Sequence, residues 1–455
     1  MNRWLTVCLL AAVPAAAAPT FTKDVAPIFF KHCVSCHKPN DIAPMSLLDY
    51  KSTRPWAKAI RASVLTRKMP PWFADPKHGH FSNDARLSEA ELATVRAWVD
   101  AGAPEGNPKD MPAAPQYTEG WQFGKPDIVI DMGETYTVTP NEDAYEHFVV
   151  PTNFTEGRWI RAAEIKPGNR KVVHHVHVLM VSEDLSKMEV ASTKNIPALS
   201  QYLIREGKLS RIRADAPVVN DACADNLPNL PFLTGYQEGG LAAFLPGRPP
   251  DVFPAGTAKW IPAGAKLEFV VHYARVSEKN EKDRTSVGLY LAPAPPERVL
   301  RRLDLRNFFM QIPAGAANHE VRRCYDFEKD KLLLSFTPHF HYRGKDVTYE
   351  VAYPDGRREI LLSVPRYDFN WQIVYRLKEP KFIPKGSRLM VTVHYDNSPN
   401  NKANPDPTQT VRWGDRSEEE MMTSWIEYLD AKPDGPAAQT SEAAGIRIQE
   451  GTRRR

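Results

Sequence analysis

Long apolar runs are missing from this sequence beyond its first twenty residues. No run there approaches the ~18 residues that a membrane-spanning helix needs, which excludes a protein with several spans. The net charge is also small, +4 from 59 basic and 55 acidic side chains, and this is too slight to indicate a nucleic-acid partner. Glycine is scarcer than proline, 24 against 40. Because proline is excluded from helix interiors and central strands, we expect short elements joined by stiff loops.

The first eighteen residues have the layout of a secretory signal peptide. A short positive start that ends at Arg3 precedes an apolar stretch from Trp4 to Val13, and small residues at 15–18 form a cleavage zone. We therefore expect residues 1–18 to be removed and the mature protein to be periplasmic or secreted. Cysteine is scarce, and once Cys8 is lost with the signal, the remaining cysteines lie in an oxidising compartment.

Residues 33–37 read Cys-Val-Ser-Cys-His, the attachment sequence of a c-type haem. The chemistry requires this order, because the thiols of Cys33 and Cys36 add to the two vinyl groups and His37 reaches the iron. The competing interpretation is a thioredoxin-like redox pair, which requires a βαβ setting that the surrounding sequence lacks.

The second axial ligand of such a haem is expected to be a thioether or another histidine. Met69 is the preferred candidate, because it lies in a loop whose following prolines fix the chain. A Met/His pair raises the haem potential and leaves no open coordination position, so this haem would transfer electrons rather than activate oxygen. The competing candidates are Met45, His78 and His80.

A capped helix closes the haem segment. Ser88 and Glu91 form a capping box, and the apolar stripe that follows ends near Gly102. Residues 20–106 therefore resemble a small single-haem cytochrome c domain. The resemblance implies an all-α fold and one covalently bound haem c.

A proline- and alanine-rich linker at 107–124 leads to a segment of different amino-acid composition. Short runs rich in Val, Ile, Tyr, Phe and Thr alternate with turn residues, as expected of β-sandwich or barrel construction. The turn-and-strand pattern of 262–273 recurs at 384–395, which suggests two similar antiparallel, jelly-roll-like sandwiches in tandem. The expected parts are β domains at 125–297 and 298–430 and a flexible tail at 431–455.

Nine of the 13 histidines lie after residue 140, most of them inside apolar, strand-like runs where an uncoordinated imidazole costs free energy. His339 and His341 lie two apart, so a strand points both rings to one face. His174 and His175 are adjacent, so they can share a metal only at a distortion or a strand end. His177 offers a same-face alternative with His175.

Histidine alone does not name the metal, because imidazole suits zinc, copper, iron and nickel. A thioether ligand would favour copper, since it is soft and suits Cu(I). Met421, which follows an acidic run near the C-terminus, is the candidate thioether.

The order of these motifs along the chain resembles the order found in a known family. The pair at 174–175 is followed by a Val-His-Tyr strand at His272, by the pair at 339–341 with Tyr-Arg-Gly-Lys after it, and by Met421. Over about residues 125–430 this order resembles the type II, ascorbate-dependent copper monooxygenases, the family of peptidylglycine alpha-hydroxylating monooxygenase and dopamine beta-monooxygenase. The resemblance implies two copper ions, one per sandwich, that face each other across a water-filled cleft.

The resemblance also implies which residues bind each copper. The ligands of the electron-transfer copper would be His174, His175 and His272. At the other copper O2 is reduced and a C–H bond of a small organic substrate is hydroxylated, and its ligands would be His339, His341 and Met421. The alternates near the two sites are His177, His394 and Met422, whereas His147 and His319 are expected to be structural.

The sequence departs from the peptide-amidating members at two positions. The arginine that anchors their substrate carboxylate, two residues before the first histidine of the pair, is Thr337 here, and their substrate-contacting tyrosine, four residues after the ligand methionine, is Trp425. Peptide amidation is therefore not implied, although C–H hydroxylation is. Those enzymes are also rich in disulfides, whereas this chain has only Cys223 and Cys324 to pair.

The haem segment and the copper segment fit one function. A copper monooxygenase of this class consumes two electrons per turnover, delivered one at a time, from ascorbate or a periplasmic donor, and a haem carries one electron. We expect an exported copper monooxygenase whose haem reduces the electron-transfer copper. The competing functions are a copper and haem electron relay without oxygenase activity, and a cell-surface binding module that carries a haem segment.

Overall fold

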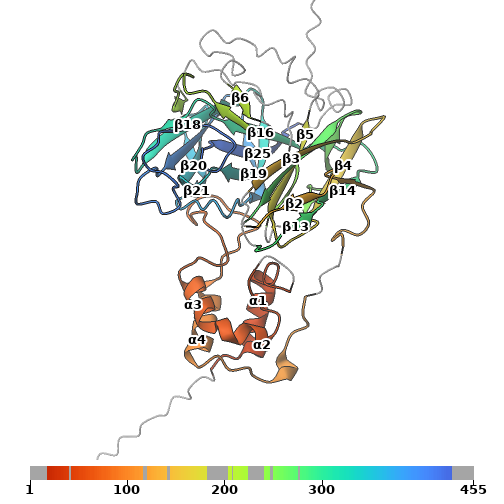
Figure 1. The fold of residues 1–455 in the computed structure, drawn as a ribbon, viewed down its shortest axis with the longest axis vertical. Helices are drawn as coiled ribbons and strands as arrows, with labels where there is room; N and C mark the ends of the chain where they lie inside the picture. The colour runs from red at the N-terminus through yellow and green to blue at the C-terminus, as the bar shows by residue number, and fades with distance from the viewer. Residues whose placement is uncertain are drawn as a thin grey trace, which may run out of the picture. The chain divides into compact units, whose positions relative to one another are not determined.

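The computed structural model describes residues 18–39, 43–115, 120–140, 144–181, 203–206, 209–223, 240–245, 250–274 and 277–432 (Figure 1). Contacts divide the chain into two compact units, Met1–Pro70 with Ala85–Gln116, and Pro71–Asp84 with Tyr117–Arg455. The expected signal peptide, apart from Ala18, and most of the expected tail lie outside the described residues.

The first unit contains the helices. A π-helical turn at Phe21–Val25 leads into α1 (Ala26–His32), and then come α2 (Tyr50–Thr53), α3 (Ala57–Leu65) and α4 (Glu89–Asp100), with 3-10 turns at Arg54–Trp56 and Pro108–Asp110. The predicted capping box is confirmed, because the Glu91 N–H donates to the Ser88 hydroxyl and the Ser88 N–H donates to the Glu91 carboxylate. Phe29, Val95 and Trp98 are fully buried in the core of this unit. No helix of the described residues is long and apolar enough to cross a membrane.

The second unit contains the described β-sheets, and two large ones come from its first half. The six-stranded sheet has the order β1 (Ile128–Asp131), β14 (Ser286–Leu291), β4 (Arg158–Lys166), β11 (Thr257–Ile261) and β15 (Arg298–Val299), with β10 (Asp251–Val252) beside β4. The four-stranded sheet has the order β3 (Ala144–Pro151), β12 (Lys266–Tyr273), β5 (Val173–Val181) and β9 (Gly240–Phe244). A small pair joins β2 (Tyr136–Val138) to β13 (Glu281–Asp283).

Two further large sheets come from the second half. One has the order β16 (Arg301–Arg306), β25 (Thr423–Asp430), β19 (Lys331–His339) and β22 (Tyr375–Ile383). The other has the order β21 (Arg358–Val364), β20 (Gly344–Ala352), β23 (Arg388–Tyr395), β18 (His319–Asp326) and β8 (Asp221–Ala222). Two small pairs are β17 (Gln311–Ile312) with β24 (Val411–Arg412), and β6 (Leu203–Glu206) with β7 (Leu209–Ile212).

The two halves of the β unit are not separate domains. β8, from the first half of the sequence, adds in parallel to β18 of the second half. The core of the first half also takes in Leu429 from the last strand, with Leu332 and Leu334 packed against it. Since strands and core residues are exchanged in this way, the sheets form one compact unit.

The fold class expected from the sequence is therefore wrong. Strands make up 40% of the structure and helices 12%, and no small all-α cytochrome domain is evident among the described residues. The α-helices have only four to twelve residues, with irregular segments between them. The expected pair of tandem antiparallel sandwiches is replaced by one β unit, which includes two parallel strand pairs, β11 with β15 and β8 with β18.

The segment 71–84 belongs to the β unit although it lies within the stretch 20–106. Its Ser82 N–H donates to the Arg376 carbonyl on β22 (2.8 Å), and the indole of Trp72 lies 5.0 Å from the ring of Tyr375. The Asn83 side chain donates to the carbonyl of Val374 (2.7 Å). Through these contacts the segment 71–84 packs against the start of β22 and the residues just before it.

Candidate metal centre

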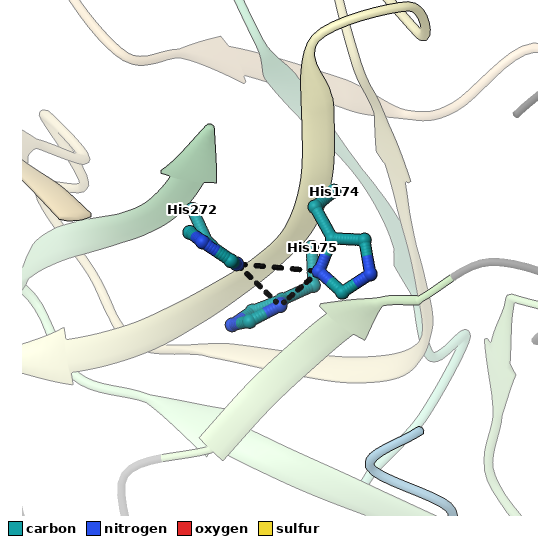
Figure 2. Close-up of side chains that lie close together, drawn as sticks. All are labelled: His174, His175 and His272. Atoms are coloured by element: carbon teal, nitrogen blue, oxygen red, sulfur yellow. Dashed lines mark hydrogen bonds between the residues drawn. The ribbon is translucent and has the colours of Figure 1, made fainter. Parts of the chain in front are cut away.

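Three histidine side chains from two paired strands converge on one point (Figure 2). His174 and His175 come from β5, and His272 comes from β12. Their Nδ1 atoms form a triangle with sides of 3.1 Å (His174 to His175), 3.2 Å (His174 to His272) and 3.3 Å (His175 to His272). We call these residues the three-histidine cluster.

A β-bulge explains how two adjacent histidines point to the same place. His272 is paired with His175, but the next residue, Tyr273, is paired with Val173, so His174 is an extra residue on β5. A bulge redirects the side chain at the irregularity. This is the distortion that two adjacent histidines need if they are to share a metal.

The triangle has the dimensions of a metal site. Nitrogens bound at about 2.0 Å to a tetrahedral metal lie about 3.3 Å apart, which is close to the observed sides. Hydrogen bonds alone do not account for the arrangement, because a neutral imidazole has one N–H and that N–H cannot point along two sides at once. One cation that accepts all three lone pairs satisfies the whole set, so these residues fit a bound metal.

A second pair of histidines lies at the end of β19. His339 is the last residue of the strand and His341 follows it, with ring centroids 5.5 Å apart and ring planes at 87°. Nδ1 of His339 donates to Oε1 of Gln372 (2.9 Å), and Nδ1 of His341 donates to the carbonyl of Glu419 (3.2 Å). Because Nδ1 carries the proton in each ring, Nε2 is the atom left for a metal. We call His339 and His341 the two-histidine pair.

Burial keeps these imidazoles in the neutral form that binds metals. Desolvation lowers the pKa of His175 well below its usual value, and the neighbouring His272 and His174 lower it further. Desolvation also lowers the pKa of His339 to about 4 and that of His341 to about 3. Metal binding then needs no proton release from these three rings at neutral pH.

Met421 is held beside His341 by a shared carboxylate. Its backbone N–H donates to Oε2 of Glu420 (3.1 Å), and the backbone N–H of His341 donates to the same oxygen (2.8 Å). Met421 is partly buried, whereas Met422 is fully buried in the core. The structure thus places the candidate thioether residue next to the two-histidine pair.

Glu420 was missed by the sequence reasoning, and it supports this region. The buried carboxylate accepts backbone hydrogen bonds from His341, Met421 and Arg343, the last at 2.7 Å.

Glu420→Ala leaves three buried N–H groups without an acceptor, each costing about 1–3 kcal/mol. We expect the free energy of unfolding to fall by at least about 3 kcal/mol in urea denaturation. Glu420→Gln keeps one acceptor oxygen and is expected to lose less; equal losses in the two variants would contradict this role.

Packed rings connect the three-histidine cluster to the two-histidine pair. His177 lies two residues after His175 on β5, with its ring centroid 5.5 Å from that of His175 and 5.3 Å from the indole of Trp425. Trp425, on β25, lies 5.2 Å from His339. Packed rings therefore run from one histidine site to the other within the β unit.

A second ring lies between the two sites. The ring of Phe369 is 6.5 Å from that of His272 and 5.9 Å from that of His341. The sequence reasoning also missed this residue, along with Gln372, because both come from a loop that no motif marks.

The other histidine candidates are engaged elsewhere. Nδ1 of His394 lies 2.6 Å from Asp346, and its Nε2 lies 3.4 Å from Glu320, so this alternate is held by two carboxylates. Nδ1 of His147 lies 2.8 Å from Glu268.

His319, at the start of β18, is partly buried, and desolvation lowers its pKa. Neither His319 nor His394 is brought to the three-histidine cluster by the described contacts.

The residues at 33–37 fit the attachment of a haem. Neither Cys33 nor Cys36 forms a disulfide, and Nδ1 of His37 donates to the carbonyl of Met45 (3.2 Å), which leaves Nε2 for an iron. Burial raises the pKa of the Cys33 thiol to about 12. Redox-active cysteines have lowered pKa values, so this shift argues against the thioredoxin-like interpretation.

The candidates for the second haem ligand fall in different units. Met69 and Met45 belong to the unit that contains the attachment sequence, and both are partly buried. His78 and His80 belong to the β unit, where the His80 carbonyl accepts from the Lys378 N–H (2.8 Å). Membership of the same unit favours the two methionines.

Cys223 and Cys324 form a disulfide across a sequence separation of 101. Cys223 directly follows β8, and Cys324 lies within β18. The bond fastens the edge strand β8 to the neighbouring sheet.

A recess that is partly open to solvent is lined by His177, one of the rings that connect the two histidine sites. Thr337 and Trp425, the two positions at which the sequence departs from the peptide-amidating enzymes, both line it, and they are paired across β19 and β25. The basic side chains that line the recess form salt bridges with carboxylates. Lys259 lies 3.0 Å from Glu427, and Arg302 lies 2.7 Å from Asp304. The recess therefore lacks the excess positive charge that would select a carboxylate.

No protein-family model matches this chain, and no curated protein matches it. Among solved structures it is similar to the major capsid protein P2 from bacteriophage PM2, with 11% identity, a TM-score of 0.23, and coverage of 65% of this chain and 97% of that one. For the infectious bursal disease virus VP2 subviral particle the identity is 8%, the TM-score 0.16 and the coverage 69% and 83%. For the mavirus major capsid protein the values are 9%, 0.16, 70% and 90%. TM-scores this low carry no argument about fold or function.

Proposed function

We propose that this protein is an exported, copper-dependent monooxygenase that hydroxylates a C–H bond of a small organic molecule with O2. The observation that carries the proposal is the triangle of Nδ1 atoms in the three-histidine cluster, with the two-histidine pair and Met421 close by. Three nitrogens at one site, and two nitrogens with a thioether at the other, are donor sets that suit copper.

In this proposal the chain holds one copper ion at each site. His174, His175 and His272 would bind the first through Nδ1, and His339, His341 and Met421 would bind the second. Bound copper would supply one-electron redox chemistry and the reduction of O2. Gln372 and the Glu419 carbonyl orient the rings of the two-histidine pair, since their hydrogen bonds fix which nitrogen is protonated.

The substrate would bind in the recess beside Thr337 and Trp425. Since its cations are paired, a neutral small molecule suits it better than an acidic one. The wall formed by the Trp425 indole favours a molecule with an apolar or aromatic part.

One haem c, attached at Cys33 and Cys36 with His37 as ligand and Met69 as the second ligand, would deliver electrons to the copper ions. Ascorbate or a periplasmic donor would reduce the haem or the copper directly. The test is to mix protein that contains reduced haem with and without copper in a stopped-flow instrument. Reoxidation of the haem only in the copper-loaded protein supports this route, and a haem that stays reduced in both samples contradicts it.

The experiment for the oxygenase reaction is substrate-dependent O2 uptake by copper-loaded protein, screened over neutral aromatic and aliphatic compounds with 18O2. We expect 18O in a hydroxylated product, and His341→Ala is expected to lower the rate by about a thousandfold or more, because it removes a ligand of the oxygen site. His394→Ala is the matched control, since the ring nitrogens of this histidine contact Asp346 and Glu320.

The runner-up is a copper and haem electron relay without oxygenase activity. The continuous ring contacts between the two histidine sites favour it, because they suit transfer between metals as well as oxygenation does. Protein that binds two copper ions yet shows no substrate-dependent O2 uptake would support the relay.

A further inference from the structure

The rings between the two histidine sites form an unbroken series within the β unit. Ring centroids are 5.5 Å apart from His175 to His177, 5.3 Å from His177 to Trp425, and 5.2 Å from Trp425 to His339. We propose that His177 and Trp425 conduct an electron from the three-histidine cluster to the two-histidine pair. The inference rests on the proposed function, because it needs a metal ion at each site.

The register of the strands fixes Trp425 in this position. Trp425 is paired with Thr337 on β19, and Thr423, two residues before it, is paired with His339. Alternate residues of a strand share a face, so Trp425 lies on the face that carries His339. On the other side, His177 shares a face of β5 with His175 for the same reason.

The surroundings of Trp425 suit a conductor that is not itself oxidised. The guanidinium of Arg302 lies 5.3 Å from the centre of the indole, and its charge disfavours a second positive charge on the ring. The indole N–H is buried and has no hydrogen-bond acceptor among the described residues, so no group nearby takes its proton. An indole radical is therefore disfavoured in both its charged and its neutral form.

The electron balance of the step is simple. A metal ion held by the three-histidine cluster would lose one electron, and a metal ion held by the two-histidine pair would gain it. Trp425 and His177 are unchanged at the end, no covalent bond forms or breaks, and no proton is transferred. The overall oxidant is O2, and the overall reductant is the haem or ascorbate of the proposed function.

Phe369 offers a competing route with longer steps. Its ring lies 6.5 Å from His272 and 5.9 Å from His341, against 5.2–5.5 Å for each step through Trp425. We therefore expect the route through Trp425 to dominate, and removal of Phe369 to have the smaller effect.

The experiment measures transfer between the sites without substrate turnover. Full-length protein with two Cu(II) ions receives one electron per molecule from a photoreduced flavin. Rapid-freeze EPR then follows the equilibration between the two copper signals, which differ because one site has three nitrogens and the other has a thioether. We expect Trp425→Leu to slow equilibration by about tenfold or more and Phe369→Leu to slow it less. Trp425→Phe, which keeps a ring, is expected to retain most of the rate.

The controls separate this inference from the proposed function. Trp159→Leu removes an indole on β4 that packs against Trp260, and it is expected to leave the rate unchanged. Suppose that Trp425→Leu binds two copper ions and that its equilibration rate is within twofold of that of the unsubstituted protein. This result would overturn the proposal that Trp425 conducts the electron, and it would not contradict the proposed monooxygenase function. Absence of copper from the unsubstituted protein would overturn both.

Discussion

Replacing His272 with alanine is expected to remove one of the two proposed copper ions from the protein. His272 supplies one corner of a triangle whose sides are 3.1–3.3 Å, and the two histidines that remain lie on one strand next to each other. Loss of one of three protein ligands should weaken copper binding at that site by about a hundredfold or more. Elemental analysis after dialysis should then give about one copper per protein, with the EPR signal of the site at His339 retained.

The matched control is His147→Ala, on the strand next to His272. His147 is paired with Val270 on β12 and its Nδ1 lies 2.8 Å from Glu268, so its loss removes that contact and leaves the triangle intact. We expect two copper ions in this variant. If His272→Ala also retained two copper ions at full affinity, the three-histidine cluster would not be a copper site.

Removal of the disulfide is expected to have a large effect on stability. Cys223 and Cys324 close a loop with a sequence separation of 101 residues, and a cross-link of that length stabilises by about 4–5 kcal/mol through the unfolded state. The double variant with Cys223→Ala and Cys324→Ala should therefore lose about 4 kcal/mol of unfolding free energy in guanidinium.

The reducing agent dithiothreitol provides a control for the disulfide variant. In copper-free protein, where the thiol has no copper to reduce or chelate, it should destabilise the unsubstituted protein to the same extent and leave the double variant unchanged, because thioether bonds to haem are not reducible by thiols. A double variant as stable as the unsubstituted protein would show that the pairing of β8 with β18 stabilises the edge without the cross-link.

The sequence was informative about the histidine sites because strand geometry is local. The alternation of a strand predicts that His339 and His341 share a face, but β19 ends at His339, so this alternation does not extend to His341. The adjacency of His174 and His175 predicts a distortion, which the structure has at the bulge opposite His272. The repeated turn-and-strand pattern at 262–273 and 384–395 corresponds to β12 and β23, which are interior strands of two sheets.

The arrangement of the sheets could not be predicted in the same way. Each strand pattern says which face is apolar, but not which sheet the strand joins, so the parallel pairing of β8 with β18 and the burial of Leu429 in the first core were missed. The short helices likewise matched local capping rules without defining an all-α domain. Gln372 lies 33 residues from its partner His339, and only the folded chain brings the two together.

Elemental analysis combined with a pyridine haemochrome assay on the purified protein tests the central claim most directly. The account predicts two copper ions and one covalently bound haem per chain, with copper falling to about one in His272→Ala and about one in His341→Ala. Zinc at the histidine sites, or haem without any copper, would contradict it.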